Sequence, residues 1–207
     1  WLRPDWIYDL NKGGALTQGD YLRRRRPNIE LQVFRTTYDT WERFKKHHYM
    51  TSDLNEAAYC FVFTWNNKMV AFNAILPQPS GQYKNAWRSS RLVVLPDFQG
   101  LGIGSKVSEF IGGILKADGK TLYTKTINPA LGLYREKSRN WEATAANGKA
   151  DSQEHIDKCS SMGGLTRASF CYKYVGNPVY GYENLLLPIE EIKRKNSMKN
   201  QLTLNFI

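Results

Sequence analysis

The residues whose types and spacing could do chemistry lie in the run Gln99-Gly100-Leu101-Gly102-Ile103-Gly104. This run follows the apolar stretch Leu92–Leu95 and precedes a stretch whose apolar residues have helical spacing. Glycines here leave backbone N–H groups uncrowded at the positive end of a helix. Such a group of amides can bind an anion, in particular a phosphate or a pyrophosphate. A glycine-rich turn without a ligand is the alternative interpretation.

Two common nucleotide-binding loops do not fit this run. A Walker loop needs Gly-Lys-Ser/Thr after its spacer, whereas the order here is Gly104-Ser105-Lys106. A dinucleotide-binding fingerprint needs a third glycine where Ser105 stands and an acidic residue at the end of the next strand, but Asp118 precedes that strand. The sequence therefore disfavours both kinds of nucleotide site.

The segment RLVVLPDFQGLGIGSKV resembles the acyl-CoA loop of GNAT N-acetyltransferases, which runs strand, Pro, aromatic residue, Gln or Arg, Gly-x-Gly-x-Gly/Ala, helix. The resemblance implies transfer of an acyl group to an amine, with acetyl-CoA or another acyl-CoA as donor. It also implies that the loop amides bind the pyrophosphate and that the preceding strand binds the pantetheine arm. The cofactor-binding residues implied are Val93, Val94, Leu95, Gln99, Gly100, Leu101, Gly102, Ile103, Gly104, Ser105 and Asn128.

The segment Asn128–Tyr134 is similar to the Asn…Ala…Leu-Tyr segment of the same family, although its Asn-to-Tyr spacing is one residue shorter. The similarity implies that Tyr134 protonates the leaving CoA thiolate. A helix tyrosine that packs on the sheet is the alternative.

The reaction also needs a group that accepts a proton from the attacking amine. Imidazole titrates near neutral pH, so the candidates are His47, His48 and, in a polar loop, His155, with Tyr49 beside the histidine pair. Adjacent histidines at a helix end can instead complement the negative charge of that end. The sequence leaves both interpretations open.

The combination HHYMTSDLN, AFNAILP, SSRLVVLPDFQGLGIG and INPAL looks like a phage and bacterial GNAT subgroup, sometimes fused to an ABC-type ATPase, and more distantly like phage Mom DNA-modifying enzymes. This implies an amine acceptor on DNA or a nucleobase, a fused or partner ATPase, and Ser90 and Arg91 as substrate-binding residues. Asp53 is a further substrate-binding candidate, because the resemblance implies that the acceptor binds between the first helical region and the strand ends. The net charge of +10 also favours a second hypothesis, a non-catalytic nucleic-acid-binding module on a GNAT scaffold.

A sheet is needed to position these residues, and the apolar patterns predict one. The expected strands are 29–37, 57–65, 68–77 (after a hairpin turn at Asn66-Asn67), 86–96, 121–127 and 167–175; the expected helices are 41–50 with Thr40 as cap, 102–116 and 129–138. The fold class expected is α/β (α+β), a GNAT fold with a mixed, mostly antiparallel sheet flanked by helices and a splayed strand pair at the acyl-CoA site.

Three segments are expected along the chain: a leader or linker over 1–28, the acyltransferase domain over 29–176, and a C-terminal extension over 177–207 whose apolar patch at 185–188 has no clear core role. The three cysteines lack CxxC spacing, so we expect reduced thiols and no metal site. No stretch is apolar enough to span a membrane, and we expect a cytoplasmic protein.

Overall fold

The computed structural model describes residues 7–9, 14–16, 29–48, 53–79, 81, 84–150, 168–191 and 202–206. An N-terminal unit contains a hairpin of β1 (Ile7–Asp9) and β2 (Gly14–Leu16), whose strands pair antiparallel. The other elements belong to a second compact unit, Glu30–Phe206. The first strand of this unit begins one residue earlier, at Ile29. This second unit carries the candidate site.

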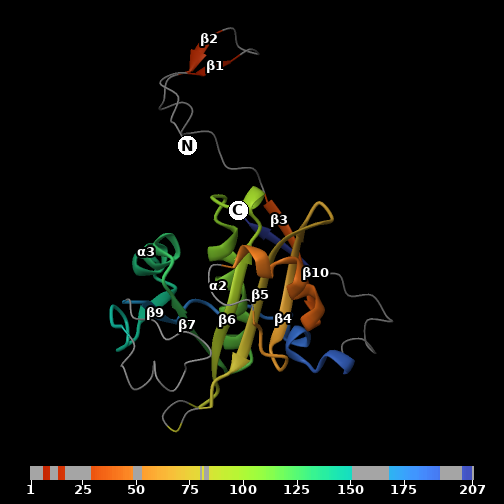
Figure 1. Cartoon of the computed structure of the whole chain (residues 1–207), viewed down its shortest axis with the longest axis vertical. Helices are drawn as coiled ribbons and strands as arrows, with labels where there is room; N and C mark the ends of the chain where they lie inside the picture. Colours follow the sequence, from red (N-terminus) through yellow and green to blue (C-terminus); the bar gives the residue numbers. More distant parts are fainter. Residues whose placement is uncertain are drawn as a thin grey trace. The chain divides into compact units, whose positions relative to one another are not determined.

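The second unit is built on an eight-stranded sheet with the order β10-β3-β4-β5-β6-β7-β9-β8 (Figure 1). Its strands are β3 (Ile29–Thr36), β4 (Tyr59–Trp65), β5 (Lys68–Pro77), β6 (Ala86–Val94), β7 (Thr121–Thr126), β8 (Trp141–Ala143), β9 (Phe170–Tyr174) and β10 (Leu202–Phe206). The pair β6–β7 is parallel, whereas β3–β4, β4–β5, β5–β6, β7–β9 and β8–β9 are antiparallel. The predicted mixed, mostly antiparallel sheet is confirmed.

One face of the sheet is covered by two short 3-10 helices, η1 (Tyr38–Arg43) and η2 (Lys45–His47). Trp41 and Phe44 are fully buried there, with ring centroids 5.3 and 5.4 Å from that of Phe72. The prediction of one helix over 41–50 is wrong, and η1 begins after Thr37 rather than after Thr40. A 3-10 helix has three residues per turn, so residues three apart such as Trp41 and Phe44 point to the same side.

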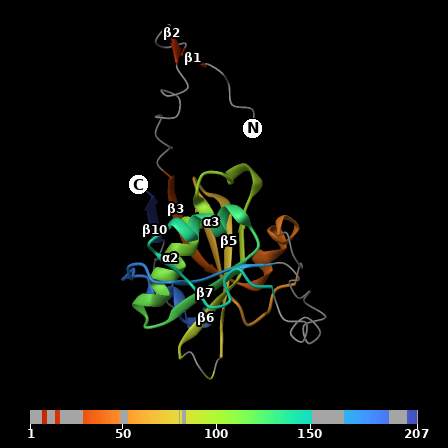
Figure 2. The ribbon, with the colours of Figure 1, turned by 90° about the vertical axis from the view of Figure 1, so that its left-hand side faces the viewer.

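The opposite face is covered by α2 (Ile103–Ala117), as Figure 2 shows. Gly112 and Gly113 allow close packing, since an added Cβ would lie 2.4 Å from the ring of Tyr174 and 2.5 Å from Val179 Cγ2. Phe110 also packs edge-to-face on Tyr182, at 5.2 Å between ring centroids. The segment after β9 therefore folds over this helix.

The chain that follows β9 contains η4 (Glu183–Leu186). Its residues Leu185 and Leu186 are buried, at 6% and 7% exposure. The expectation that this apolar patch has no core role is therefore wrong. A single short apolar run after a polar loop has no periodicity of its own, and only tertiary contact with α2 reveals its burial.

Two smaller elements flank the site: η3 (Pro96–Phe98), which leads into the glycine loop, and α3 (Pro129–Lys137), which follows β7. No helix within the described ranges has the length and hydropathy of a membrane span. Of the cysteines, Cys60 and Cys171 are buried free thiols, and Cys159 lies outside the described residues.

Candidate active site

The strands β6 and β7 separate along their length and open a gap in the middle of the sheet. Their parallel ladder consists of Ala86–Thr121, Trp87–Leu122 and Arg88–Tyr123. Beyond Arg88, β7 continues to pair with β9 on its other side, whereas no described strand pairs with the edge of β6 that faces β7 there. The expected splayed strand pair is present, and it leaves backbone groups of β6 available to a bound molecule.

A β-bulge lies where the strands separate. Ile75 pairs with Ser89 and Ala74 pairs with Arg91, so Ser90 is the extra residue of β6. The buried amide of Asn73 donates to the carbonyl of Arg91 at 3.1 Å, which bridges the two strands beside this bulge. The bulge therefore bends β6 away from β7 at a defined position.

A pocket occupies this divergence. Residues of β6, of β7 and of α3 with its N-cap line it, together with one histidine that follows η2. The lining residues are His48, Ser89, Ser90, Leu92, Thr124, Lys125, Thr126, Asn128, Leu131 and Arg135. Hydroxyls and cationic side chains predominate, and no described lining residue is acidic.

The glycine loop joins β6 to α2 at the end of the diverging strand. Gly100 and Gly102 have φ angles of 79° and 83°, values that favour glycine strongly over other residues. Within the described ranges, the backbone N–H groups from Gly100 to Ser105 donate to no backbone or side-chain acceptor. They are the unsatisfied amides of a helix N-terminus, which is where an anion binds.

Gln99 supports the loop from within. Its side-chain Nε2 donates to the carbonyl of Val94 at 2.9 Å, and its own N–H donates to Pro96 at 3.1 Å. The side chain of Gln99 thus fixes the turn between β6 and the loop. The expected contact of this residue with pyrophosphate stays a prediction.

The three strand residues predicted to line the pantetheine arm take different positions. Val93 packs in the core on the Trp41 side, Val94 lies against Gly104, and the N–H of Leu95 donates to Val70 at 2.9 Å. The side chain that lines the pocket from this stretch is Leu92.

Asn128 stands between β7 and α3 and caps the helix. Its Oδ1 accepts from the N–H groups of Ala130 and Leu131, at 3.0 and 3.3 Å. The cap orients α3 so that Leu131 and Arg135, which lie one turn apart, face the pocket.

Tyr134 lies on a different side of α3 and is not one of the lining residues. Its hydroxyl donates to the carboxylate of Glu109 in α2 at 2.6 Å. Burial, followed by this hydrogen bond and the negative charge of Glu109, raises the pKa of Tyr134 to about 12. The phenol is thus held in its protonated form.

Glu109 is buried and accepts several further hydrogen bonds. Asn140 Nδ2 donates at 3.1 Å, and Ser138 Oγ and Lys106 Nζ lie at 3.4 Å. Burial by itself would raise the pKa of Glu109, but the donors and the positive charge of Lys106 outweigh it, and the pKa is lowered. A charged carboxylate therefore ties α3 and the following turn to α2.

The predicted acceptor residues divide into two groups. His48 lines the pocket, and its ring lies 5.7 Å from that of Trp41, whereas His47 is not a lining residue and Tyr49 falls outside the described residues, as does His155. The histidine pair thus contributes one side chain to the pocket.

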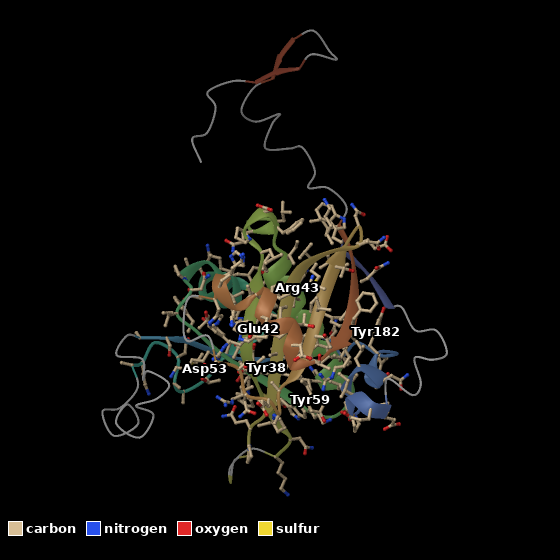
Figure 3. The ribbon with its side chains drawn as sticks, turned by 45° about the vertical axis from the view of Figure 1, so that its right-hand side comes forward. Tyr38, Glu42, Arg43, Asp53, Tyr59 and Tyr182 are labelled. Carbon is tan, nitrogen blue, oxygen red and sulfur yellow. The ribbon has the colours of Figure 1, made fainter. Side chains whose placement is uncertain are left out.

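Arg91 brings the three predicted substrate-binding residues together. Its guanidinium donates to the carbonyls of Ser90, at 2.8 Å, and of Asp53. In Figure 3, Asp53 is labelled together with Tyr38, Glu42 and Arg43 of η1. Arg91 therefore connects the segment at Asp53 to the bulge of β6.

Several lining residues were not predicted. Ser89, Leu92, Thr124, Lys125, Thr126, Leu131 and Arg135 were missed. The resemblance indicated a splayed strand, so the residues facing it from the next strand and helix could have been considered. No sequence signal distinguishes Arg135 from a surface arginine.

Comparison with known proteins shows that part of this chain is similar to a described family. Residues 56–137 match the family model "Acetyltransferase (GNAT) domain". For this segment, the predicted similarity to a GNAT acetyltransferase domain is confirmed. A search of curated proteins found no match.

Solved structures share the fold. A ribosomal-protein alanine N-acetyltransferase from Escherichia coli has 14% identity, covers 73% of this chain and 97% of its own, and gives a TM-score of 0.50. An acetyltransferase from Bacillus subtilis in complex with CoA has 12% identity, with 70% and 97% coverage and a TM-score of 0.48. A GNAT family acetyltransferase from Elizabethkingia anophelis with acetyl-CoA bound has 14% identity, 70% and 95% coverage and a TM-score of 0.43. The first of these shows that this chain has the GNAT fold.

Proposed function

We propose that this protein transfers an acyl group from an acyl-CoA, preferentially acetyl-CoA, to an amine. The observation that carries the proposal is one continuous path: the gap between β6 and β7 leads to the glycine loop at the N-terminus of α2. The gap offers a strand edge that pairs with no other described strand, and the loop offers amides suited to a diphosphate. The match of residues 56–137 to the GNAT acetyltransferase model supports the same proposal of acyl transfer.

The cofactor is proposed to bind with its pyrophosphate on the amides of Gly100–Ser105 and its pantetheine arm along the edge of β6 that faces β7. The arm carries two amide groups, and strand backbone can hydrogen-bond to them as a further strand would. The thioester then lies in the pocket, next to the bulge at Ser90.

The acyl transfer needs an uncharged amine, and we propose His48 as the base that takes its proton. Its position on the pocket wall favours it over His47, and Tyr49 remains a candidate beside it. Tyr134 remains a proposed proton donor to the thiolate, but in that role its hydroxyl has to exchange Glu109 for the sulfur.

For the acceptor we propose an amine carried by DNA or a modified nucleobase, bound near Asp53, Ser90 and Arg91. The net charge of +10 supports contact with a polyanion. The kinship with phage Mom proteins and with ATPase-fused members, and hence an ATPase partner, belongs to this finer proposal. Acyl-CoA supply and the buried free thiols fit a cytoplasmic reaction.

The proposal is tested by following release of free CoA with a thiol reagent. The protein is mixed with acetyl-CoA and, in parallel reactions, with primary amines, a lysine peptide, free nucleobases or duplex DNA. Acceptor-dependent release, with acetyl label on the acceptor, is the expected result. Salt-sensitive DNA binding without any acetyl-CoA binding would instead identify the non-catalytic module and remove the catalytic assignments.

A further inference from the structure

We infer that Arg135 stabilises the negative charge that develops on the CoA sulfur as the thioester breaks. This inference rests on the proposed function and adds to it a catalytic residue on α3. It concerns the step in which the leaving group departs.

Placement is the first argument. Arg135 lines the pocket together with Leu131, one helical turn earlier, and with Thr124 and Thr126 of the facing strand. Tyr134 is turned by about 100° around the helix and donates its hydroxyl proton to Glu109. The charged α3 side chain that lines the pocket is therefore the guanidinium.

The guanidinium is also held in position. Its Nη2 donates to Ser108 Oγ of α2 at 2.9 Å, and its central carbon lies 4.6 Å from the ring centroid of Trp141. Arg135 is 2% exposed, so a charge near it is poorly screened by water. A fixed, weakly hydrated cation is suited to stabilising a charge that exists only transiently.

The chemistry balances without a further reactant. The amine nitrogen forms a bond to the thioester carbonyl carbon, the C–S bond breaks, and its electron pair stays on sulfur. The amine proton passes to the base, proposed to be His48, or to water. Because an arginine keeps its proton at neutral pH, Arg135 neutralises the thiolate electrostatically and does not protonate it.

Other charged groups surround the same space. His48 and Lys125 line the pocket, and Glu109 and Lys106 lie on α2 behind Tyr134. Lys125 is exposed, so solvent weakens its effect. The buried Arg135 is thus expected to dominate the field at the sulfur.

The test measures the pKa of the thiol of bound CoA, from the ultraviolet absorbance of its thiolate or from the pH dependence of CoA affinity. The same titration of free CoA supplies the reference value. Bound to the wild-type protein, the CoA thiol is expected to titrate about one unit lower. Arg135→Met should return it to the free value, whereas the exposed control Lys137→Met should leave it lowered.

Each outcome decides. A folded wild-type protein that binds no CoA overturns the proposed function. CoA binding with an unshifted thiol, or a shift that survives Arg135→Met or disappears in Lys137→Met, overturns the role of Arg135 alone. If Arg135→Met does not fold, Ser108→Ala releases the guanidinium while keeping its charge; a smaller shift is expected, and an unchanged shift overturns the inference.

Discussion

The glycine loop lies between β6 and α2, helix α3 lines the pocket, and the two offer different kinds of chemistry. The loop offers backbone amides, which the positive φ angles of Gly100 and Gly102 help to set. Helix α3 offers side chains, whose direction depends on helical rotation and on the contacts of Glu109 and Ser108. A backbone site is encoded by a few glycines, whereas a side-chain site depends on register.

The largest effect that this comparison predicts is at the loop. Gly102→Glu places a side chain at a φ of 83° and a negative charge at the amides, so acetyl-CoA affinity should fall by at least about two orders of magnitude. Calorimetry with acetyl-CoA measures it. Gly119→Glu is the matched control: Gly119 follows the other end of α2 with a φ of 68°, so the variant carries similar strain and should keep its affinity. Equal losses of affinity in both variants would mean that backbone strain, and not the blocked loop amides, is the cause.

The next largest effect is expected at His48, the proposed base on the pocket wall. His48→Ala should lower kcat by about 100-fold, the usual contribution of a general base, with little change in acetyl-CoA affinity. The neighbouring His47→Ala is the control and should lie within about threefold of wild type, since His47 does not line the pocket. Steady-state kinetics, with the acceptor that the CoA-release assay identifies, makes the comparison. A loss confined to His47→Ala would overturn this assignment.

The hydrogen bonds to the Glu109 carboxylate allow a test of how much side-chain contacts of α3 contribute to stability. Glu109→Ala leaves the hydroxyl of Tyr134 and the amide of Asn140 without their acceptor, which should lower the free energy of unfolding by about 1–3 kcal/mol. Urea denaturation measures this change. Glu136→Ala, an exposed site on α3, should change it by about 0.5 kcal/mol at most.

The same network predicts a pH dependence. Since folding lowers the pKa of Glu109, its charged form stabilises the protein above the unfolded value of about 4.3, and this contribution is lost as the pH falls through the folded pKa. The stability difference between wild type and Glu109→Gln should therefore be larger at pH 7 than at pH 3.5. A difference that grows on acidification would contradict the lowered pKa.

The smallest effect concerns the helix cap. Asn128→Ala removes the acceptor for the N–H groups of Ala130 and Leu131 and should lower the free energy of unfolding by about 1 kcal/mol. Asn128→Asp keeps an acceptor there and should retain most of that stability. Thermal unfolding of the two variants separates the cap from any contact of Asn128 with the cofactor.

The sequence predicted the backbone part of this molecule well. The apolar run before the glycines indicated β6, and the helical spacing from Ile103 indicated α2, because both patterns follow directly from burial. It did not distinguish two 3-10 helices from an α-helix near Trp41, since a spacing of three fits both. The strand β8 was missed because it is three residues long and two of them are exposed.

The side-chain part was harder to predict. The interval from Asn128 to Tyr134 indicated a shortened motif, but the sequence does not show which side chain then faces the pocket. One residue rotates a helix by about 100°, which is enough to exchange Tyr134 for Arg135 on the pocket wall. The sequence also does not show whether an arginine is buried, and only the contacts of Arg135 with Ser108 and Trp141 reveal that it is.

The central claim is that the gap between β6 and β7 and the amides of the glycine loop bind an acyl-CoA. Calorimetric titration of the wild-type protein with acetyl-CoA, repeated with dephospho-CoA and with pantetheine, tests it most directly. The account predicts micromolar binding of acetyl-CoA and dephospho-CoA, and much weaker binding of pantetheine, which lacks the pyrophosphate. Pantetheine binding as tight as that of acetyl-CoA, or no binding of acetyl-CoA by the folded protein, would contradict it.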